Sequence, residues 1–327
     1  MPAHHREWVT DWSRRHDSGP VVAGLGHVDH RKVTRPRQRP CTISDGGSGG
    51  EYRQRTAILV VIDGLRPDAI RDDTTPVLHR MMGLGWVAGS AVTVRPSVTV
   101  AALTSLGTGV SPGVHGMDNQ SRWTLPRFRG LQPLPGELRR HGVETTVVTP
   151  ELPGSVRWLA GALLRLGGVA RLKASASEPA RLVDTALHTL DKAQGPAFVV
   201  AYLNDADLAG HAWGWMSPAY LQAAGAIDRS LAGLMSLVSS PEHLVVITAD
   251  HGGGGVLERD HDHPHPLNDA IPLLLLGGRV VPGRGGDLPA HLLDVPPTVL
   301  HHFGAPTPPS YRGRVLEEAF TAAAVCG

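Results

Sequence analysis

Three apolar runs in the chain are followed by residues of the kinds that bind metal ions. The runs TAILVVI, AFVVAYL and HLVVITA lead into Asp63, into Asp207 and His211, and into Asp250 and His251, respectively. Carboxylate and imidazole groups together suit zinc, and also manganese or iron(II). We expect Asp63, Asp250 and His251 to form one site, with Asp207 and His211 in a second. Two cations about 4 Å apart can clamp a phosphoryl group between them.

The second group needs another ligand, and a histidine cluster further along the chain can supply it. The stretch HDHPHP contains His261, His263 and His265. By itself such a stretch also fits a solvated polar loop. The residue pattern leaves open which of the three histidines joins Asp207 and His211.

A candidate nucleophile lies between the first two ligand groups. Thr99 stands at the start of TVAALTSLGTG, which predicts a short apolar helix ending at Gly109. The free N–H groups and the dipole at such a helix start favour an anion. A threonine there can attack phosphorus and form a phosphothreonine. The alternatives are an ordinary helix cap or one of the nearby hydroxyls, which belong to Thr93, Ser97, Thr104 and Ser105.

The elements that must position these residues are indicated by hydrophobic patterning. Apolar runs alternate with helical sequence, which predicts an α/β fold with a mostly parallel central sheet sandwiched by helices. Ligands bind such sheets beyond the carboxyl ends of the strands. Further strands are expected in GWVAGSAVTV, ETTVVTP and AIPLLLLGG, and a helix over 217–238 with Ser217 as its N-cap and Pro218 in its first turn. The four glycines after His251 are expected to keep the mouth of the site open.

The chain is expected to contain one catalytic domain, over residues 55–321. Residues 1–54 are polar and rich in Arg and His, without a helical or strand period, and are expected to form a disordered tail. Residues 120–195 are expected to form a small, mostly helical insert or cap. Residues 322–327 are a second tail.

Composition narrows the class of protein. The 327 residues are 41% hydrophobic, and the net charge of +1 gives no electrostatic case for nucleic acid or a membrane as the main partner. Two cysteines, Cys41 and Cys326, provide neither a disulfide framework nor a CxxC metal site. The first residues show no apolar core of the kind that a signal peptide needs, and no run approaches the length of a membrane span. We therefore expect a cytoplasmic protein.

Taken together and in order, the motifs resemble the alkaline phosphatase superfamily, in its nucleotide pyrophosphatase/phosphodiesterase branch. The motifs that carry the resemblance span residues from about 56 to 320 and are VVIDGLRPD, TVAALTSLGTGVSPGVHG, DADLAGH, ADHGGGG and the C-terminal LLDVPPTVLHHFGAPTPPSYRGRVLEEAF. Each motif alone is modest, but the set in this order is specific. The Cys-x-Pro-x-Arg nucleophile of sulfatases is absent, and the central Ser and large inserted domain of cofactor-independent phosphoglycerate mutases are not evident.

The resemblance implies how the ligands divide. It implies that Thr99 is the nucleophile and holds one metal together with Asp63, Asp250 and His251. Asp207, His211 and a final histidine would hold the other. That histidine stands some ten residues before an Ile/Val-Pro pair in the family, which favours His261 over His263 and His265. The expected cofactors are two divalent ions, zinc first, with manganese or magnesium as alternatives.

The resemblance also implies the reaction. We expect a metal-dependent hydrolase that cleaves phosphodiester or nucleotide pyrophosphate bonds through a phosphothreonine intermediate. Its substrate would be a small-molecule phosphate ester or a nucleotide. The alternatives are a phosphomonoesterase or a phosphonate hydrolase using the same site, and a metal-binding relative without catalysis.

Overall fold

A computed structural model describes residues 55–118, 130–152, 154–286 and 289–320. The two expected tails, 1–54 and 322–327, lie outside the described residues. No helix in the described part of the chain is long and apolar enough to cross a membrane.

The core of the domain is an eight-stranded sheet in the order β5-β4-β6-β1-β7-β8-β2-β9. The first five strands in this order are parallel to one another, as expected, whereas β8 runs antiparallel to β7. The strand bounds are β1 Thr56–Ile62, β2 Trp86–Val87, β4 Glu144–Pro150, β5 Arg171–Ser175, β6 Ala197–Leu203, β7 His243–Thr248, β8 Leu273–Leu276 and β9 Gly283–Arg284. The alternation of apolar runs and helical sequence therefore predicted the fold class correctly.

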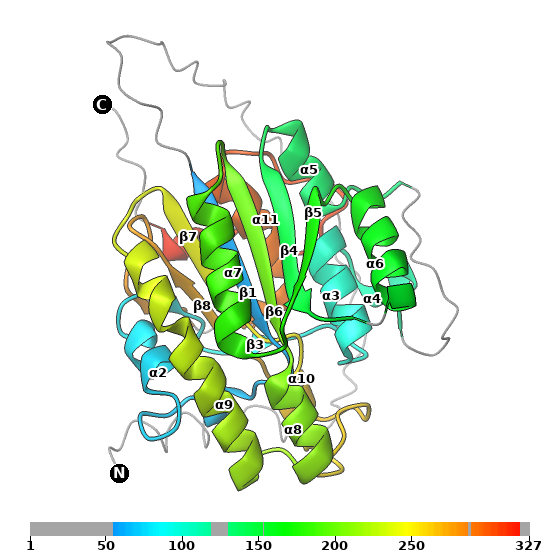
Figure 1. Cartoon of the computed structure of the whole chain (residues 1–327), viewed down its shortest axis with the longest axis vertical. Coiled ribbons are helices and arrows are strands. Elements are labelled where there is room, and N and C mark those ends of the chain that lie inside the picture. Colours follow the sequence, from blue (N-terminus) through cyan, green and yellow to red (C-terminus); the bar gives the residue numbers. More distant parts are fainter. Residues whose placement is uncertain (1–54, 119–129, 153, 287–288, 321–327) are drawn as a thin grey trace, which may run out of the picture. The chain divides into compact units, whose positions relative to one another are not determined.

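Helices cover both faces of this sheet (Figure 1). Figure 1 shows α7 (Pro179–Asp191) and α9 (Pro218–Ser230) in front of the strands, with α11 (Val295–His302) behind them. The other helices are α2 Pro76–Met82, α3 Thr99–Thr108, α4 Pro112–His115, α5 Leu134–Arg140, α6 Gly154–Leu166, α8 Asp205–Trp213 and α10 Pro266–Asp269. Short 3-10 turns lie at Pro67–Ala69, Leu231–Leu237, Leu292–Asp294 and Glu317–Ala319. The expected sandwich of helices around a central sheet is confirmed.

Strand β1 explains why the ligand motifs converge. All seven of its residues are buried, and it pairs with β6 on one side and β7 on the other. The register aligns Ile62 with Leu203 and Val61 with Thr248. Because these parallel strands end together, the residues that follow them emerge at one edge of the sheet.

Some expectations about individual elements hold and others do not. Helix α9 begins at Pro218, and the Ser217 side chain accepts a hydrogen bond from the Tyr220 N–H, as its N-cap role predicts. Helix α3 ends at Gly109, which adopts a left-handed φ of 68°. The expected helix over 217–238, however, changes to a 3-10 helix after Ser230.

Two strands differ from the sequence interpretation. The stretch RLKAS forms β5 inside the region expected to be mostly helical. It was missed because an edge strand is buried on few sides, so it lacks an apolar run. The stretch GWVAGSAVTV contains two short strands, β2 and β3 (Ala91–Val92), and β3 pairs with β10 (Ala290–His291) in a separate two-stranded sheet.

Candidate metal centre

The strand ends bring together the first predicted group. The Nε2 atom of His251 lies 3.1 Å from Asp63 Oδ1 and 3.6 Å from Asp250 Oδ2. All three residues are buried, and one ligand atom from each lies within 4.8 Å of the others. Thr99 belongs beside this group, because its hydroxyl oxygen is 3.2 Å from His251 Nε2.

The second predicted group is also assembled. Helix α8 presents Asp207 and His211 one turn apart, and the His211 Nε2 atom is 3.4 Å from Asp207 Oδ1. His261 reaches the same carboxylate oxygen from its loop, at 3.8 Å. The three ligand atoms again lie within 4.8 Å of one another.

The other two histidines of the HDHPHP stretch lie outside this group. The side chain of His263 is exposed and contacts Asp260. His265 is the N-cap of α10, where its Nδ1 atom accepts a hydrogen bond from the Leu267 N–H. Among the three candidates, the structure thus brings only His261 to Asp207 and His211.

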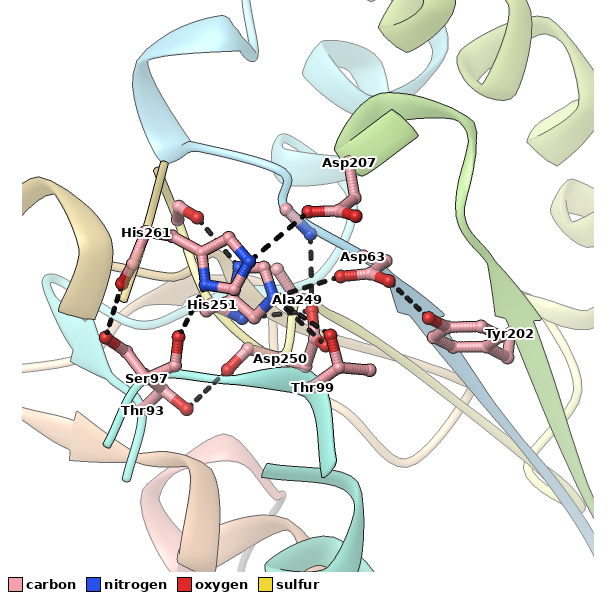
Figure 2. A network of polar contacts seen from close by, with 12 residues as sticks. Asp63, Thr93, Ser97, Thr99, Tyr202, Asp207, Ala249, Asp250, His251 and His261 are labelled. Carbon is pink, nitrogen blue, oxygen red and sulfur yellow. Dashed lines mark hydrogen bonds and ion pairs between the residues drawn. The ribbon is translucent and has the colours of Figure 1, made fainter. Parts of the chain in front are cut away.

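The two groups are neighbours. The rings of His251 and His261 stack with their centroids 3.8 Å apart and an angle of 17° between their planes. Figure 2 shows the two stacked rings with Asp63, Asp207, Asp250 and Thr99 around them. One ligand could therefore contact both groups at once.

Backbone carbonyls set the orientation of all three histidines. The Nδ1 atoms of His251, His211 and His261 lie 2.8, 2.9 and 3.0 Å from the carbonyl oxygens of Gly252, Arg259 and Ser97, respectively. A carbonyl oxygen only accepts, so each Nδ1 carries a hydrogen, which leaves Nε2 as the ring atom that can bind a metal ion. The three Nε2 atoms face the carboxylates. This is the arrangement by which proteins fix histidine ligands of metals.

The carboxylates show the complementary feature. Asp63 Oδ1, Asp207 Oδ1 and Asp250 Oδ2 are buried and have no hydrogen-bond partner in the described part of the chain. The second oxygen of Asp63 accepts from the Tyr202 hydroxyl, and that of Asp250 accepts from the N–H groups of Gly64 and His251. Buried oxygens are normally satisfied. Three of them lie close to three imidazole Nε2 atoms, and this mixture of ligand atoms fits divalent cations.

The electrostatics of the cluster also favour a cation. Burial raises the pKa of the Asp250 carboxyl to about 7, and the nearby Asp63 carboxylate adds to the shift. Burial would lower the pKa of His251, but the Asp250 and Asp63 charges outweigh it and raise that pKa to about 10. Burial lowers the pKa of His261 to about 4, so its ring is neutral at pH 7. A cation bound beside the carboxylates would displace the His251 proton.

The candidate nucleophile stands at the start of a helix. Val98 is the N-cap residue of α3 and Thr99 the first helical residue. The first intrahelical bond runs from the Ala102 N–H to the Val98 carbonyl, at 3.0 Å, so the N–H groups of residues 99–101 have no carbonyl partner within the helix. Thr99 is thus not the helix cap, and donors for an anion lie beside its hydroxyl.

The other hydroxyls considered near the helix have structural contacts. Thr93 donates to the Asp250 carbonyl, and Ser97 donates to the His261 carbonyl at 3.4 Å. Ser105 lies 2.9 Å from the His115 ring. Thr104 lies five residues beyond Thr99 on α3 and lines an apolar cavity.

Three aromatic residues that support the site were not anticipated from the sequence. Besides the Tyr202 contact to Asp63, Trp215 Nε1 and Tyr220 Oη each donate to the Gly64 carbonyl at 2.9 Å. They fix the turn that follows Asp63. Tyr202 could have been found in the sequence, since it is a polar side chain within an apolar strand. Trp215 and Tyr220 could not, because Tyr220 lies on α9 and Trp215 in the segment before it, far from Gly64 in the sequence.

The glycine run serves packing and not an open mouth, which corrects our expectation. A Cβ atom at Gly253 would overlap the Trp215 ring, and one at Gly254 would lie 2.7 Å from Trp215 Cβ. One at Gly252 would overlap the Leu267 carbonyl, and one at Gly255 the His265 ring. The loop lacks side chains because these neighbours fill the space.

An apolar cavity adjoins the nucleophile helix. Its volume is about 320 Å³, and it lies between α3, α5 and α6. Val100 and Leu103 of α3 line it, opposite Pro133, Leu163 and other apolar residues. Thr99 itself does not line the cavity, but Leu103, four residues further along the same face of α3, does.

The arrangement of sheet, helices and ligand groups defines a class of protein. The fold resembles that of a Vibrio parahaemolyticus protein of the alkaline phosphatase superfamily, with a TM-score of 0.63 at 17% identity over 82% of this chain and 70% of that one. It is also similar to a phosphonate monoester hydrolase from Silicibacter pomeroyi, with a TM-score of 0.61 at 16% identity over 83% of this chain and 78% of that one. The chain thus has the fold of the alkaline phosphatase superfamily.

The family follows from the sequence match. Residues 57–132 and 140–287 match the type I phosphodiesterase/nucleotide pyrophosphatase family. The match covers more than half of the chain, and the chain belongs to this family, as its motifs predicted.

Curated relatives match over shorter stretches. A 2,3-bisphosphoglycerate-independent phosphoglycerate mutase from Rippkaea orientalis is 32% identical over 155 residues, which make up 45% of this chain but only 28% of the mutase. The corresponding mutase of Microcystis aeruginosa is 35% identical over 127 residues, or 36% of this chain and 23% of the mutase. The matches thus span less than a third of the mutases.

Proposed function

We propose that the protein is a two-metal hydrolase that cleaves phosphodiester or nucleotide pyrophosphate bonds, with Thr99 as its nucleophile. One observation carries the proposal: three buried carboxylate oxygens that accept no hydrogen bond within the described chain, and three imidazole Nε2 atoms, converge beside the Thr99 hydroxyl. A purely structural polar cluster would satisfy these oxygens internally.

The donor sets suggest how the metals divide. Asp63, Asp250, His251 and Thr99 would hold one ion, and Asp207, His211 and His261 the other. The mixture of imidazole and carboxylate ligands favours zinc, with manganese or magnesium as alternatives. When bound, such ions supply Lewis acidity toward phosphoryl oxygens and lower the pKa of coordinated hydroxyl groups.

The residues of the chain would carry out the rest of the reaction. The Thr99 oxygen attacks phosphorus and gives its proton to water, the bond from phosphorus to the leaving oxygen breaks, and the leaving oxygen takes up a proton from water. The unpaired N–H groups at the start of α3 can donate to phosphoryl oxygens as charge develops there. Water then cleaves the phosphothreonine, which releases the phosphate product and restores the hydroxyl group.

The apolar cavity along the nucleophile helix supports a diester over a phosphate monoester, because a diester has a second organic group that needs a place to bind. Val100 and Leu103 of α3 line this cavity, and Leu103 lies on the same face of the helix as Thr99. The nearest alternatives are a phosphomonoesterase and a phosphonate hydrolase on the same site; the structural similarity to a phosphonate monoester hydrolase favours the latter. A metal-binding relative without catalysis is a further alternative.

The test combines metal analysis with turnover. Mass spectrometry of the purified protein is expected to find about two equivalents of divalent metal, and the same sample is expected to hydrolyse bis(p-nitrophenyl) phosphate faster than p-nitrophenyl phosphate. Thr99→Ala is expected to abolish turnover while metal content is kept. Thr185→Ala, the same change on α7, serves as the control and is expected to retain activity.

The opposing outcomes point to the alternatives. Faster hydrolysis of p-nitrophenyl phosphate would favour a phosphomonoesterase, and faster hydrolysis of p-nitrophenyl phenylphosphonate a phosphonate hydrolase. A protein that takes up metal but turns over none of the three esters would be the non-catalytic relative. Full activity in Thr99→Ala would refute the assigned nucleophile.

A further inference from the structure

A second cavity, lined by charged side chains, lies at the opposite end of the sheet from the candidate metal centre. Its volume is about 320 Å³, and its walls are the first residues of β4, β5 and β6 together with the last turn of α7 and the loop that follows. The metal-ligand motifs follow the last residues of their strands. Strand β6 has seven residues, so at about 3.3 Å per residue the two sites are separated by roughly 20 Å along the strand.

The charges of this cavity are unbalanced. Three cationic side chains line it, those of Arg171, Lys173 and Lys192, against one carboxylate, that of Glu144. Arg171 pairs with Glu144 at 3.2 Å, but both side chains are more than half exposed, so the pair is weak. Lys192 contacts Asp191 at 3.5 Å, again at the exposed surface. The cavity therefore carries a net positive charge.

Lys173 is the partly buried cation of this cavity, and its hydrogen-bond partner is neutral. It lies on β5 and is only partly exposed, and its ammonium group donates to the Thr189 hydroxyl at 2.9 Å. That hydroxyl in turn donates to the Thr185 carbonyl. Within the described chain, Lys173 has no carboxylate within 4 Å. A partly buried ammonium whose partner is neutral has lost hydration without gaining an opposite charge.

The arrangement of these side chains is set by strand geometry. Arg171 and Lys173 are two residues apart on β5, so they project from the same face of the sheet. Their register partners on β4 are Thr146 and Val148, and Thr146 lines the same cavity. Gly142 and Gly195 also line it, and a Cβ atom at either would meet no other atom within 4 Å. The rim is thus open for a ligand to enter.

We propose that this cavity is a binding site for the phosphate group of a small anion, held by Arg171, Lys173 and Lys192. A guanidinium group and two ammonium groups are the donors that proteins use for phosphate. The volume lies at the lower end of the range for small-molecule sites, which fits inorganic phosphate or a small organic phosphate. The site is separate from the metal centre and does not depend on the reaction proposed there.

The test follows phosphate binding at both ends of the sheet in the same sample. Hydrogen–deuterium exchange of the full-length, metal-loaded protein is measured during titration with inorganic phosphate. Phosphate is expected to slow exchange in peptides that cover the starts of β4 and β5 and the loop before β6. In Lys173→Met the apparent Kd for this protection is expected to rise at least about tenfold, the ratio expected for one hydrogen bond to a charged group.

The controls separate the possible outcomes. Arg181→Met removes one positive charge from the exposed surface of α7, outside the cavity, and is expected to keep the protection. Peptides at the start of α3 report on phosphate at the metal centre and are expected to respond equally in all variants. Lys192→Met is a second variant of the cavity in case Lys173→Met alters folding. The proposal is overturned if wild type shows no protection at the strand starts, or if both cavity variants keep the wild-type Kd.

Discussion

Removing the Tyr202 hydroxyl tests whether the residues around the ligands tune the metal centre. Tyr202 donates to Asp63 Oδ2, which leaves Oδ1 of the same carboxylate facing His251. Tyr202→Phe keeps the ring but frees Asp63 to rotate. It also leaves a buried carboxylate oxygen without its donor.

The magnitude follows from the charge on the acceptor. A hydrogen bond to a charged group contributes about 1.5–3 kcal/mol. Loss of such an outer partner of a metal ligand typically weakens metal binding by about 10–100-fold, which corresponds to about 1.4–2.7 kcal/mol. The two estimates agree, so we expect the zinc Kd of Tyr202→Phe to rise by about one to two orders of magnitude.

The assay is calorimetric titration of zinc into chelator-treated protein. Tyr311→Phe is the matched control, because the Tyr311 hydroxyl is also engaged but donates to the Gln132 carbonyl at 3.0 Å, away from the carboxylates. The control is expected to bind zinc like wild type. The reasoning is refuted if Tyr202→Phe binds zinc within about twofold of wild type, or if both variants lose affinity equally.

Three further predictions concern packing, metal binding and pH. Gly253→Ala forces a methyl group against Trp215 and is expected to lower the free energy of unfolding by about 1–3 kcal/mol. Gly113→Ala, where the added methyl group meets nothing within 4 Å, is expected to leave the free energy of unfolding unchanged. Equal urea midpoints for the two variants would contradict this prediction. Removal of metal by a chelator is expected to lower the Tm, and zinc at 100 times its Kd should raise the free energy of unfolding again by about 2.7 kcal/mol. A Tm that does not respond to metal would argue against the metal centre. Burial lowers the pKa of His302 to about 4, below the unfolded value of about 6.5, so its stabilisation is present above pH 6.5 and decreases by up to about 3 kcal/mol as the pH falls toward 4. Urea titrations of metal-free protein should therefore show that the free energy of unfolding depends less on pH in His302→Gln than in wild type. Parallel pH curves for the two proteins would rule out His302 as the cause of this dependence.

Local patterns in the sequence were sufficient for the strands that carry the ligands. A strand such as β1, buried on both faces, must be a continuous apolar run, so the place where it ends and Asp63 begins is visible in the sequence. Asp207 and His211 share one face of a helix because they are four residues apart. Parallel pairing then brings these strand ends to one edge, which made the two ligand groups predictable as groups.

Only the tertiary structure decided features that depend on contacts between distant segments. His261, His263 and His265 have the same local pattern, and what distinguishes them is that the Ser97 carbonyl orients one of them toward Asp207. The glycines after His251 indicate a close approach, but the Trp215 ring that requires two of them lies on another segment.

The same reason explains the elements and cavities that the sequence did not reveal. Strand β5 is identified by its pairing with β4 and not by an apolar run. The cations of the phosphate site proposed above, Lys173 and Lys192, come from a strand and a helix end that the fold places together. Residue type and spacing thus determined the chemistry available to this protein. The pairing of segments far apart in the chain determined which of those residues meet, because a contact between distant segments leaves no periodic trace in either one.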